Sequence, residues 1–422
     1  MTPKKTTLPN GLRIITVPIK DAPTVTMLVT VEAGSKYETK NIIGLSHFLE
    51  HMCFKGTTKR PNAIDISREL DSIGAHYNAS TSQEFTGYYA KSHPKHISKL
   101  VDVISDMYLN PIFDEKEIEK EKGVIVQEIL MYEDMPHRHV HDVFLDLLYG
   151  DQPAGWNIAG TPELVKSFSR DNFLDYRREH YVASGTIVVV AGNFDEDVLL
   201  AEIEKAFSSI SAGTKQGKVS VGETQKMPAI KFIQKDTDQT HLILGVRSFG
   251  ANDKRLPAMN VLNSVLSGGM SARLFQKLRD EMGICYYVRA GSDEYTDHGY
   301  LAVSAGVDSN RINEAVGAIM AELRRFKTEP VAVDELAKAK DQIVGSLYLG
   351  LESSDAIADF ASFQEVVRGE IKTPEEYAEE ISAVSAAEVT ALANQIFIDE
   401  HLNLAIISKK VDEAALSSAL HF

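Results

Sequence analysis

The sequence repeats itself at the scale of a domain, and this constrains its fold more than any other feature. The chain has 422 residues, and both halves contain the order strand, helix, two strands and two helices. Residues 71–77, DSIGAHY, match 280–286, DEMGICY, and 96–101 resemble 311–316 further along. Chance similarity between helices of equal polarity is the alternative interpretation. Because the matches keep one order, we favour a true duplication.

A segment without apolar periodicity separates the halves. Strand-like runs in the first half alternate with helix-period stretches, which indicates an α+β fold. Residues 211–228, SAGTKQGKVSVGETQKMP, are rich in Gly, Ser, Thr and Lys, as linkers are. We therefore predict two duplicated α/β-sandwich domains, each a mainly antiparallel sheet packed with helices. The predicted boundaries are 1–212 for the first domain, 213–228 for the linker and 229–422 for the second domain.

Composition and charge exclude several classes of protein. Hydrophobic residues make up 44% and charged residues 25%, as in a folded chain with large cores. The net charge is −16, and no basic cluster could neutralise several phosphates, so we expect no nucleic-acid partner. No run of about 18 apolar residues occurs, and the N-terminal residues continue directly into an alternating strand. We therefore expect no membrane insertion and a cytoplasmic location.

The most informative short motif is HFLEH at residues 47–51, within a segment whose apolar spacing is helical. Residues i and i+4 share one face of a helix, so His47 and His51 can present imidazole nitrogens to one tetrahedral ion. Glu50 can then act on a water molecule instead of binding the metal. Chance predicts at most about 0.06 such patterns in a chain of this composition. Two structural histidines on a buried helix face are the alternative.

A catalytic zinc site needs a third protein ligand, and Glu128 is our choice. It lies in the helix-like stretch 115–134 among apolar residues, where a lone carboxylate is costly to desolvate unless a cation or proton compensates it. Glu121, two helical turns earlier on the same face, is expected to orient a ligand or the reacting water. We thus predict Glu50 and Glu121 as catalytic residues. The predicted ligands of one Zn²⁺ per chain are His47, His51 and Glu128.

These residues resemble a known family. The H-x-x-E-H helix and the segment 121–136, EKGVIVQEILMYEDMP, are similar to the pitrilysin/insulinase family of zinc peptidases, which includes mitochondrial processing peptidase. The resemblance covers nearly the whole chain and continues at 74–81, at 160–161 and at 268–286. It implies a zinc metalloendopeptidase that cleaves peptides or unfolded polypeptides held in a chamber. It also implies the same metal ligands and the same general base, Glu50.

The resemblance further implies contacts with substrate. Arg279 and Tyr286 match the substrate-binding pair of the family and would steady the substrate and the developing oxyanion. The family's edge strand, which pairs with extended substrate, corresponds to Asn78, Ala79, Ser80 and Thr81. One departure is visible, because the family commonly has His-Pro-Leu-Gly where this chain has QPAG at 152–155. The hinge or subsite role of that loop is therefore left open.

The duplication places the metal chemistry in the first half. The second half has Asn260, Asn263, Ser264 and Ser346 at the positions that correspond to His47, Glu50, His51 and Glu128, in that order. We therefore expect the second domain to supply walls and substrate contacts.

Assembly can also be predicted from this arrangement. Family members of double length enclose substrate between two such halves, with the zinc in one and the Arg/Tyr pair in the other. This chain carries both sets of residues, so we expect a homodimer whose chains complete each other's sites. The rival interpretation is a non-catalytic structural or peptide-binding subunit of the same family. Such subunits typically lose the metal motif, which this chain keeps.

A second histidine-rich segment lies at 135–141, MPHRHVH. His137, His139 and His141 alternate, which is compatible with a second metal site. They directly follow Pro136 at the predicted start of a helix, so we favour capping and solvation instead.

Overall fold

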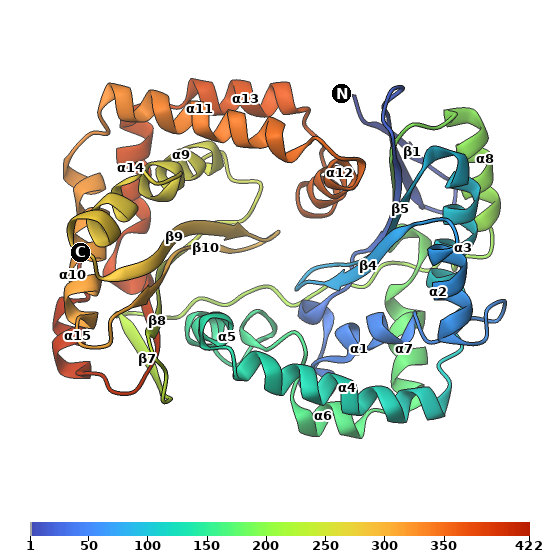
Figure 1. Ribbon diagram of the computed structural model, residues 1–422, viewed down its shortest axis with the longest axis horizontal. Helices are drawn as coiled ribbons and strands as arrows, with labels where there is room; N and C mark the ends of the chain where they lie inside the picture. The colour runs from blue at the N-terminus through green and yellow to red at the C-terminus, as the bar shows by residue number, and fades with distance from the viewer. Residues whose placement is uncertain (1) are drawn as a thin grey trace. The chain divides into compact units, whose positions relative to one another are not determined.

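The two sheets of the computed structural model share one strand order, as the duplication predicts (Figure 1). The structure describes residues 2–422. The first sheet has the order β1-β2-β6-β3-β5-β4 and the second β7-β11-β8-β10-β9. Apart from the added β1, the orders correspond strand by strand. Each sheet has one parallel pair, β2 with β6 and β7 with β11, and its other pairs are antiparallel. The strands are β1 (Lys4–Thr7), β2 (Arg13–Pro18), β3 (Val25–Val31), β4 (His76–Thr81), β5 (Thr86–Ser92), β6 (Thr186–Gly192), β7 (Ala229–Gln234), β8 (Thr240–Ser248), β9 (Cys285–Glu294), β10 (Gly299–Val307) and β11 (Leu402–Ser408).

The helices follow the same duplicated order. In the first half they are α1 (Leu45–Met52), α2 (Ala63–Asp71), α3 (Ile97–Leu109), α4 (Glu115–Glu133), α5 (Pro136–Tyr149), α6 (Pro162–Ser167), α7 (Arg170–His180) and α8 (Glu196–Ala206). In the second half they are α9 (Leu256–Ser267), the π-helix η6 (Phe275–Glu281), α10 (Ile312–Thr328), α11 (Val333–Gly350), α12 (Ser354–Arg368), α13 (Pro374–Ala383), α14 (Ala386–Ile396) and α15 (Glu413–Ala419). The predicted fold class is confirmed. In the described part of the chain, no helix has both the length and the apolar character needed to cross a membrane.

The alternation of side chains along a strand lets a sheet pack against helices on both of its faces. In β8, Leu242, Leu244 and Val246 face the core that α9, α10 and α14 cover. Ile243, between them, points to the opposite face and packs with α5. Successive side chains of a strand point to opposite faces, so a strand that is apolar on both faces predicts helices on both sides.

The compact units do not coincide with the sequence halves. The first unit contains residues up to 130, 156–219 and 350–373, and the second contains 131–155, 220–349 and 374–422. Helix α5 therefore packs on β8 and β11 of the second sheet, and α12 packs on β3 and β6 of the first. Each half of the sequence thus contributes one helix to the compact unit of the other half. We call this the exchange of helices, and it is reciprocal because α5 and α12 hold corresponding places in the duplicated order. The predicted division at 1–212, 213–228 and 229–422 describes the sequence repeat and stays a prediction.

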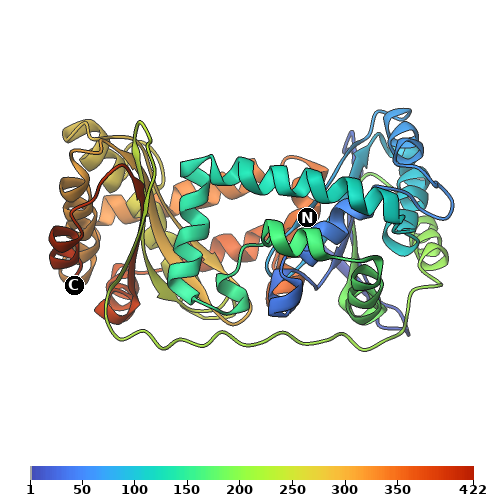
Figure 2. The ribbon, with the colours of Figure 1, turned by 90° about the horizontal axis from the view of Figure 1, so that it is seen from below.

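The predicted linker contains no regular secondary structure between residues 211 and 226, and Figure 2 shows it as a long yellow-green coil. Gln152 fixes its far end within the second unit. The side-chain amide of Gln152 donates to the carbonyl oxygen of Gly222 and accepts from its N–H, each at 2.9 Å. Gln152, which stands where the family commonly has a histidine, thus anchors the linker.

Both exchanged helices bury apolar side chains, and α12 adds several hydrogen bonds to strand β3. Helix α5 buries Val140, Val143 and Phe144 against the apolar face of the second sheet. Helix α12 buries Ile357, Ala358 and Ala361, and the hydroxyls of its Ser354 and Ser362 also bond to threonines of β3 and the adjoining residue 24. We infer that hydrophobic burial contributes to the docking of both helices and that hydrogen bonds further orient α12.

We predict that Phe144→Ala will destabilise the second unit, although residue 144 belongs to the first half of the sequence. The Phe144 ring lies so close to Gly245 that a Cβ there would come within 2.6 Å of it. Loss of a buried phenylalanine typically lowers the free energy of unfolding by about 3 to 5 kcal/mol. Hydrogen exchange should show faster exchange in β8 and β11 than in β3 and β6. Phe173→Ala, in the core of the first unit, is the matched control and should give the reverse order. Faster exchange confined to β3 and β6 in Phe144→Ala would contradict the exchange of helices.

Candidate metal centre

Helix α1 presents His47, Glu50 and His51 on its half-buried side. Its buried side is mostly apolar, with Leu45, Phe48, Leu49 and Met52 in the core of the first unit. This apolar face fixes the rotation of the helix, so the imidazole rings lie together with their centroids 4.7 Å apart. The helical spacing of the motif is therefore present.

Helix α4 brings Glu128 to the two imidazoles. Its Oε2 lies 3.8 Å from Nε2 of His47 and 3.6 Å from Nε2 of His51. Both separations exceed the range of ordinary N–H···O hydrogen bonds. Metal bonds of about 2.0 to 2.2 Å at tetrahedral angles place ligand atoms about 3.3 to 3.6 Å apart. The three donor atoms all lie within 4.8 Å of one another, so these residues could hold one zinc ion.

The donor chemistry of His47 also fits a metal. Burial, together with the neighbouring His51, lowers the pKa of His47 to about 4, so its imidazole is neutral at neutral pH. A neutral imidazole keeps the lone pair that a metal ligand needs. Within residues 2–422, the buried Nδ1 of His47 has no hydrogen-bond partner. Packing against its neighbours, rather than a hydrogen bond, therefore sets the orientation of this ring.

His51 is oriented by Glu121. Its Nδ1 donates to Oε1 of Glu121 at 2.9 Å, which leaves Nε2 directed toward Glu128. The other oxygen of Glu121 pairs with Lys55 at 2.6 Å. Burial alone would raise the pKa of Glu121, but its bonds to His51 and Lys55 lower it. Burial opposes a charge on His51, but the hydrogen bond to Glu121 and the nearby carboxylates raise the pKa of His51. Glu121 thus has the contacts of a residue that positions a ligand, and its catalytic role stays a prediction.

Glu50 lies beside this cluster without joining it. Its carboxylate accepts a hydrogen bond from the hydroxyl of Thr81 at 2.6 Å. Burial raises the pKa of Glu50 and nearby Glu128 adds to this, against the effects of Thr81 and His51. A carboxylate with a raised pKa is better matched to proton transfer near neutral pH.

The residues predicted to pair with substrate lie on β4, an edge strand of the first sheet. Asn78 and Ser80 are exposed, whereas Ala79 and Thr81 are half-buried. Thr81 is the last residue of β4 and contacts Glu50, so one end of this free edge lies beside the metal centre. Pairing with substrate stays a prediction.

Arg279 and Tyr286 are brought together in the second unit. The Arg279 guanidinium lies 5.6 Å from the centroid of the Tyr286 ring and 4.8 Å from that of Phe275. Tyr286 is 73% exposed and occupies an irregularity of β9, where Val307 pairs with Cys285 but Gly306 pairs with Tyr287. Such bulges redirect side chains, and the sequence pattern did not predict this one. The role of the pair in substrate binding stays a prediction.

The second unit repeats two of the site's contacts without its chemistry. Asn263 donates to Ser292 at 2.9 Å, as Thr81 donates to Glu50 in the first unit. Ser264 donates to the carbonyl oxygen of Ala339 at 3.1 Å, where the first unit pairs His51 with Glu121. The duplicated framework is therefore present in both units, whereas the predicted metal ligands His47, His51 and Glu128 all belong to the first.

Lys55, which pairs with Glu121 at this centre, was not predicted. Its only sequence signal is the i+4 spacing from His51.

The histidine-rich segment at 135–141 belongs to the second unit. His137 and His141 are exposed on α5, and no side chain caps the start of that helix. In the described chain, neither is part of a three-ligand group with donor atoms within 4.8 Å. Solvation thus describes them better than capping.

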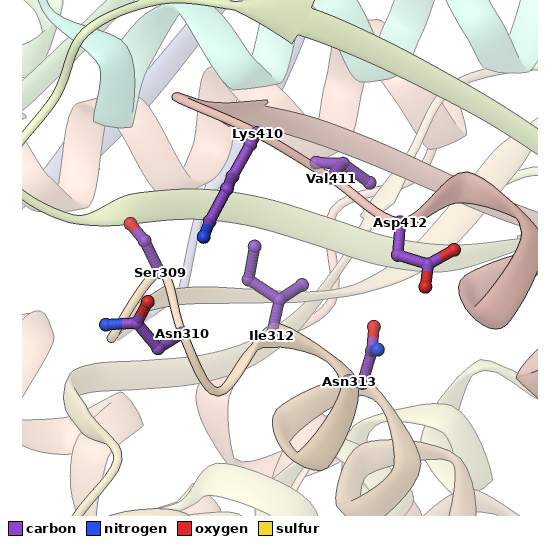
Figure 3. A pocket seen from close by; sticks show the side chains of 7 residues that line it. All are labelled: Ser309, Asn310, Ile312, Asn313, Lys410, Val411 and Asp412. Carbon is purple, nitrogen blue, oxygen red and sulfur yellow. The ribbon is translucent and has the colours of Figure 1, made fainter.

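A hollow of about 320 Å³ in the second unit contains none of the predicted site residues (Figure 3). It lies between the start of α10 and the turn after β11. Its lining residues are Ser309, Asn310, Ile312, Asn313, Lys410, Val411 and Asp412.

Comparisons with known proteins show the family of this chain. Residues 13–162 match the family model Insulinase (Peptidase family M16), and residues 167–343 match the model Peptidase M16 inactive domain. The chain is 37% identical over 409 residues to "Uncharacterized zinc protease YmxG" of Bacillus subtilis, covering 96% of this chain and 98% of that one. It is 35% identical over 391 residues to an uncharacterized zinc protease of Rickettsia bellii, covering 92% and 94%.

Solved structures share the fold. A protease from Helicobacter pylori has a TM-score of 0.89 at 20% identity, covering 96% of this chain and 99% of that one. A chain of Complex III2 from Candida albicans has a TM-score of 0.86 at 19% identity, covering 99% and 100%. The resemblance seen in the sequence is confirmed, and the chain belongs to the insulinase family of peptidases, family M16.

Proposed function

We propose that this protein is a zinc metalloendopeptidase that cleaves peptides or unfolded polypeptides, with one zinc ion per chain. The observation that carries the proposal is the convergence of the Nε2 atoms of His47 and His51 with Oε2 of Glu128, at spacings that fit one tetrahedral ion. The carboxylate of Glu50 lies beside these donors. The names of relatives as zinc proteases support the same function.

Each side chain has a separate task in this proposal. A zinc ion held by His47, His51 and Glu128 would supply Lewis acidity toward a water molecule and the scissile carbonyl. Glu50 accepts the proton of the attacking water and passes it to the leaving amine. Thr81 holds the Glu50 carboxylate in place through its hydroxyl. Glu121, itself paired with Lys55, keeps His51 in the orientation that leaves Nε2 free to bind.

Substrate recognition is proposed to use the backbone more than side chains. An extended peptide added to the free edge of β4 would gain main-chain hydrogen bonds that tolerate many sequences. Arg279 and Tyr286 would then steady the substrate and the developing oxyanion. A chamber that admits only unfolded chains completes the proposal.

A non-catalytic structural or peptide-binding role is the second candidate. The observation that favours it is the similarity in fold to a chain of Complex III2. The match to a domain described as inactive covers residues 167–343, a range without any of the proposed metal ligands. The complete metal cluster in the first unit favours the peptidase.

We predict that Glu50→Gln will retain zinc but lose cleavage of unfolded casein. An amide cannot accept the proton, so turnover should fall by a factor on the order of 10² to 10⁴. Glu128→Gln should instead weaken zinc binding, because an amide is a poor substitute for a carboxylate ligand. Zinc content by atomic absorption and casein cleavage, each with and without a chelator, test both variants.

Loss of zinc in Glu50→Gln would contradict the assignment of Glu50 as the base. Zinc-loaded wild type that binds casein without cleaving it would support the non-catalytic role instead.

We further propose that the working enzyme is a homodimer. The metal centre and the Arg279/Tyr286 pair belong to different compact units of the same chain. In a twofold dimer, the pair of one chain can serve the zinc of the other reciprocally.

Mixing two inactive variants tests this arrangement. One variant is Glu50→Gln, and the other combines Arg279→Ala with Tyr286→Phe. If sites are shared between chains, random exchange makes about half of the dimers mixed, and each mixed dimer has one intact site, so roughly a quarter of wild-type activity should return. No recovery under conditions of proven subunit exchange, or a monomeric mass at active concentrations, would rule out shared sites.

A further inference from the structure

The start of α1 lacks a conventional cap. The helix has only eight residues, and its N-cap residue, Gly44, has a φ of +95° and provides no side-chain hydrogen bond. The first N–H groups of a helix have no partner within the helix, and an end left unsatisfied frays. His47 lies in this first turn. A frayed start would therefore move one of the proposed ligands.

The backbone excludes the usual solution at Gly44. A Cβ at this position would lie 2.6 Å from the carbonyl oxygen of Ala159, and a Cβ at Gly160 would lie 2.4 Å from that of Ile43. Neither contact is tolerable, and L side chains also disfavour the φ of Gly44. The serine, threonine or aspartate that commonly caps a helix cannot occupy this position. Any cap must come from elsewhere in the chain.

Glu38 supplies that cap from six residues upstream. Its Oε2 accepts from the N–H of Gly44 at 2.8 Å, and its Oε1 accepts from the N–H of Ser46 at 2.6 Å and from the Ser46 hydroxyl. The side chain is buried, with 3% exposure. Burial raises the pKa of Glu38 to about 8, and the hydrogen bonds from Ser46 and Gly44 oppose this rise. Burial thus favours the neutral form, whereas the three donors and the helix dipole favour the charged form, since every one of these groups donates to a carboxylate oxygen.

We propose that Glu38 is a positioning residue of the metal centre. It fixes the first turn of α1 against the backbone of residues 159–160 and thereby fixes where the imidazole of His47 lies relative to Glu128. The inference rests on the proposed zinc site, but not on peptidase turnover. Metal ligands must be placed within about 0.2 Å of their ideal distances, so a small movement of this turn should weaken binding.

The test is the zinc affinity of Glu38→Gln. Both carboxylate oxygens of Glu38 accept from backbone N–H groups. In Glu38→Gln, either orientation of the side-chain amide would therefore place its NH₂ group against one of these donors, and one hydrogen bond would be lost. Zinc dissociation constants from competition with a chelating dye should rise about 10- to 100-fold, the usual effect of losing a group that supports a ligand. The rise in melting temperature caused by saturating zinc should shrink accordingly, because that increment depends on the dissociation constant.

Two further variants separate positioning from general stability. Ser46→Ala removes one of the three contacts and should weaken zinc binding in the same direction but less. Glu32→Gln is the matched control, because Glu32 is a buried carboxylate of the same unit that pairs with Arg13 and Lys215. It should lower the melting temperature of the metal-free protein without changing the zinc dissociation constant.

Each outcome has a definite meaning. Unchanged zinc affinity in Glu38→Gln would overturn the inference. If that variant does not fold, unchanged affinity in Ser46→Ala overturns it. Equal losses of affinity in Glu32→Gln and Glu38→Gln would also overturn it, since the effect would then be general. A wild-type protein that binds no zinc would refute the proposed function instead.

Discussion

The candidate site depends on the meeting of two helices that are far apart in the sequence. Helix α1 supplies two imidazoles and α4 supplies a carboxylate, and each helix buries an apolar face in the core of the first unit. The hydrogen bond from His51 to Glu121 joins the same two helices one layer behind the donors. The apolar packing of both helices and this bond involve protein groups alone, so they help to hold the ligand side chains near one another.

Much of this site could be predicted because its signals are local or periodic. The spacing of His47 and His51 is a property of any helix, and a carboxylate among apolar residues identified Glu128. Glu38 and Lys55 could not be found in this way. Glu38 acts through backbone groups of the turn that follows it, and its role arises from a close backbone approach at Gly44 and Gly160 that no sequence pattern encodes.

The fold shows the same division between local and distant information. Strand order and fold class follow from periodicity and the repeat. The exchange of α5 and α12 does not, because an amphipathic pattern tells which face of a helix is buried but not which sheet covers it. The bulge at Tyr286 was hidden for a related reason, since one extra residue in a strand leaves the alternation around it nearly unchanged.

The exchanged helices have a consequence for how the chain can be divided. The backbone passes between the two units after residues 130, 155, 219, 349 and 373, so the linker is only one of five covalent connections. A protease that cuts the linker would leave four connections intact and would not release two separate proteins. A chain truncated to either half would lose packing contacts that its own helices and strands need. The first half would carry α5 without the sheet that it covers, and the second half would leave Ile243, Ala405 and Ile407 open to water. We therefore expect the two halves of this chain to fold together and not as separate domains.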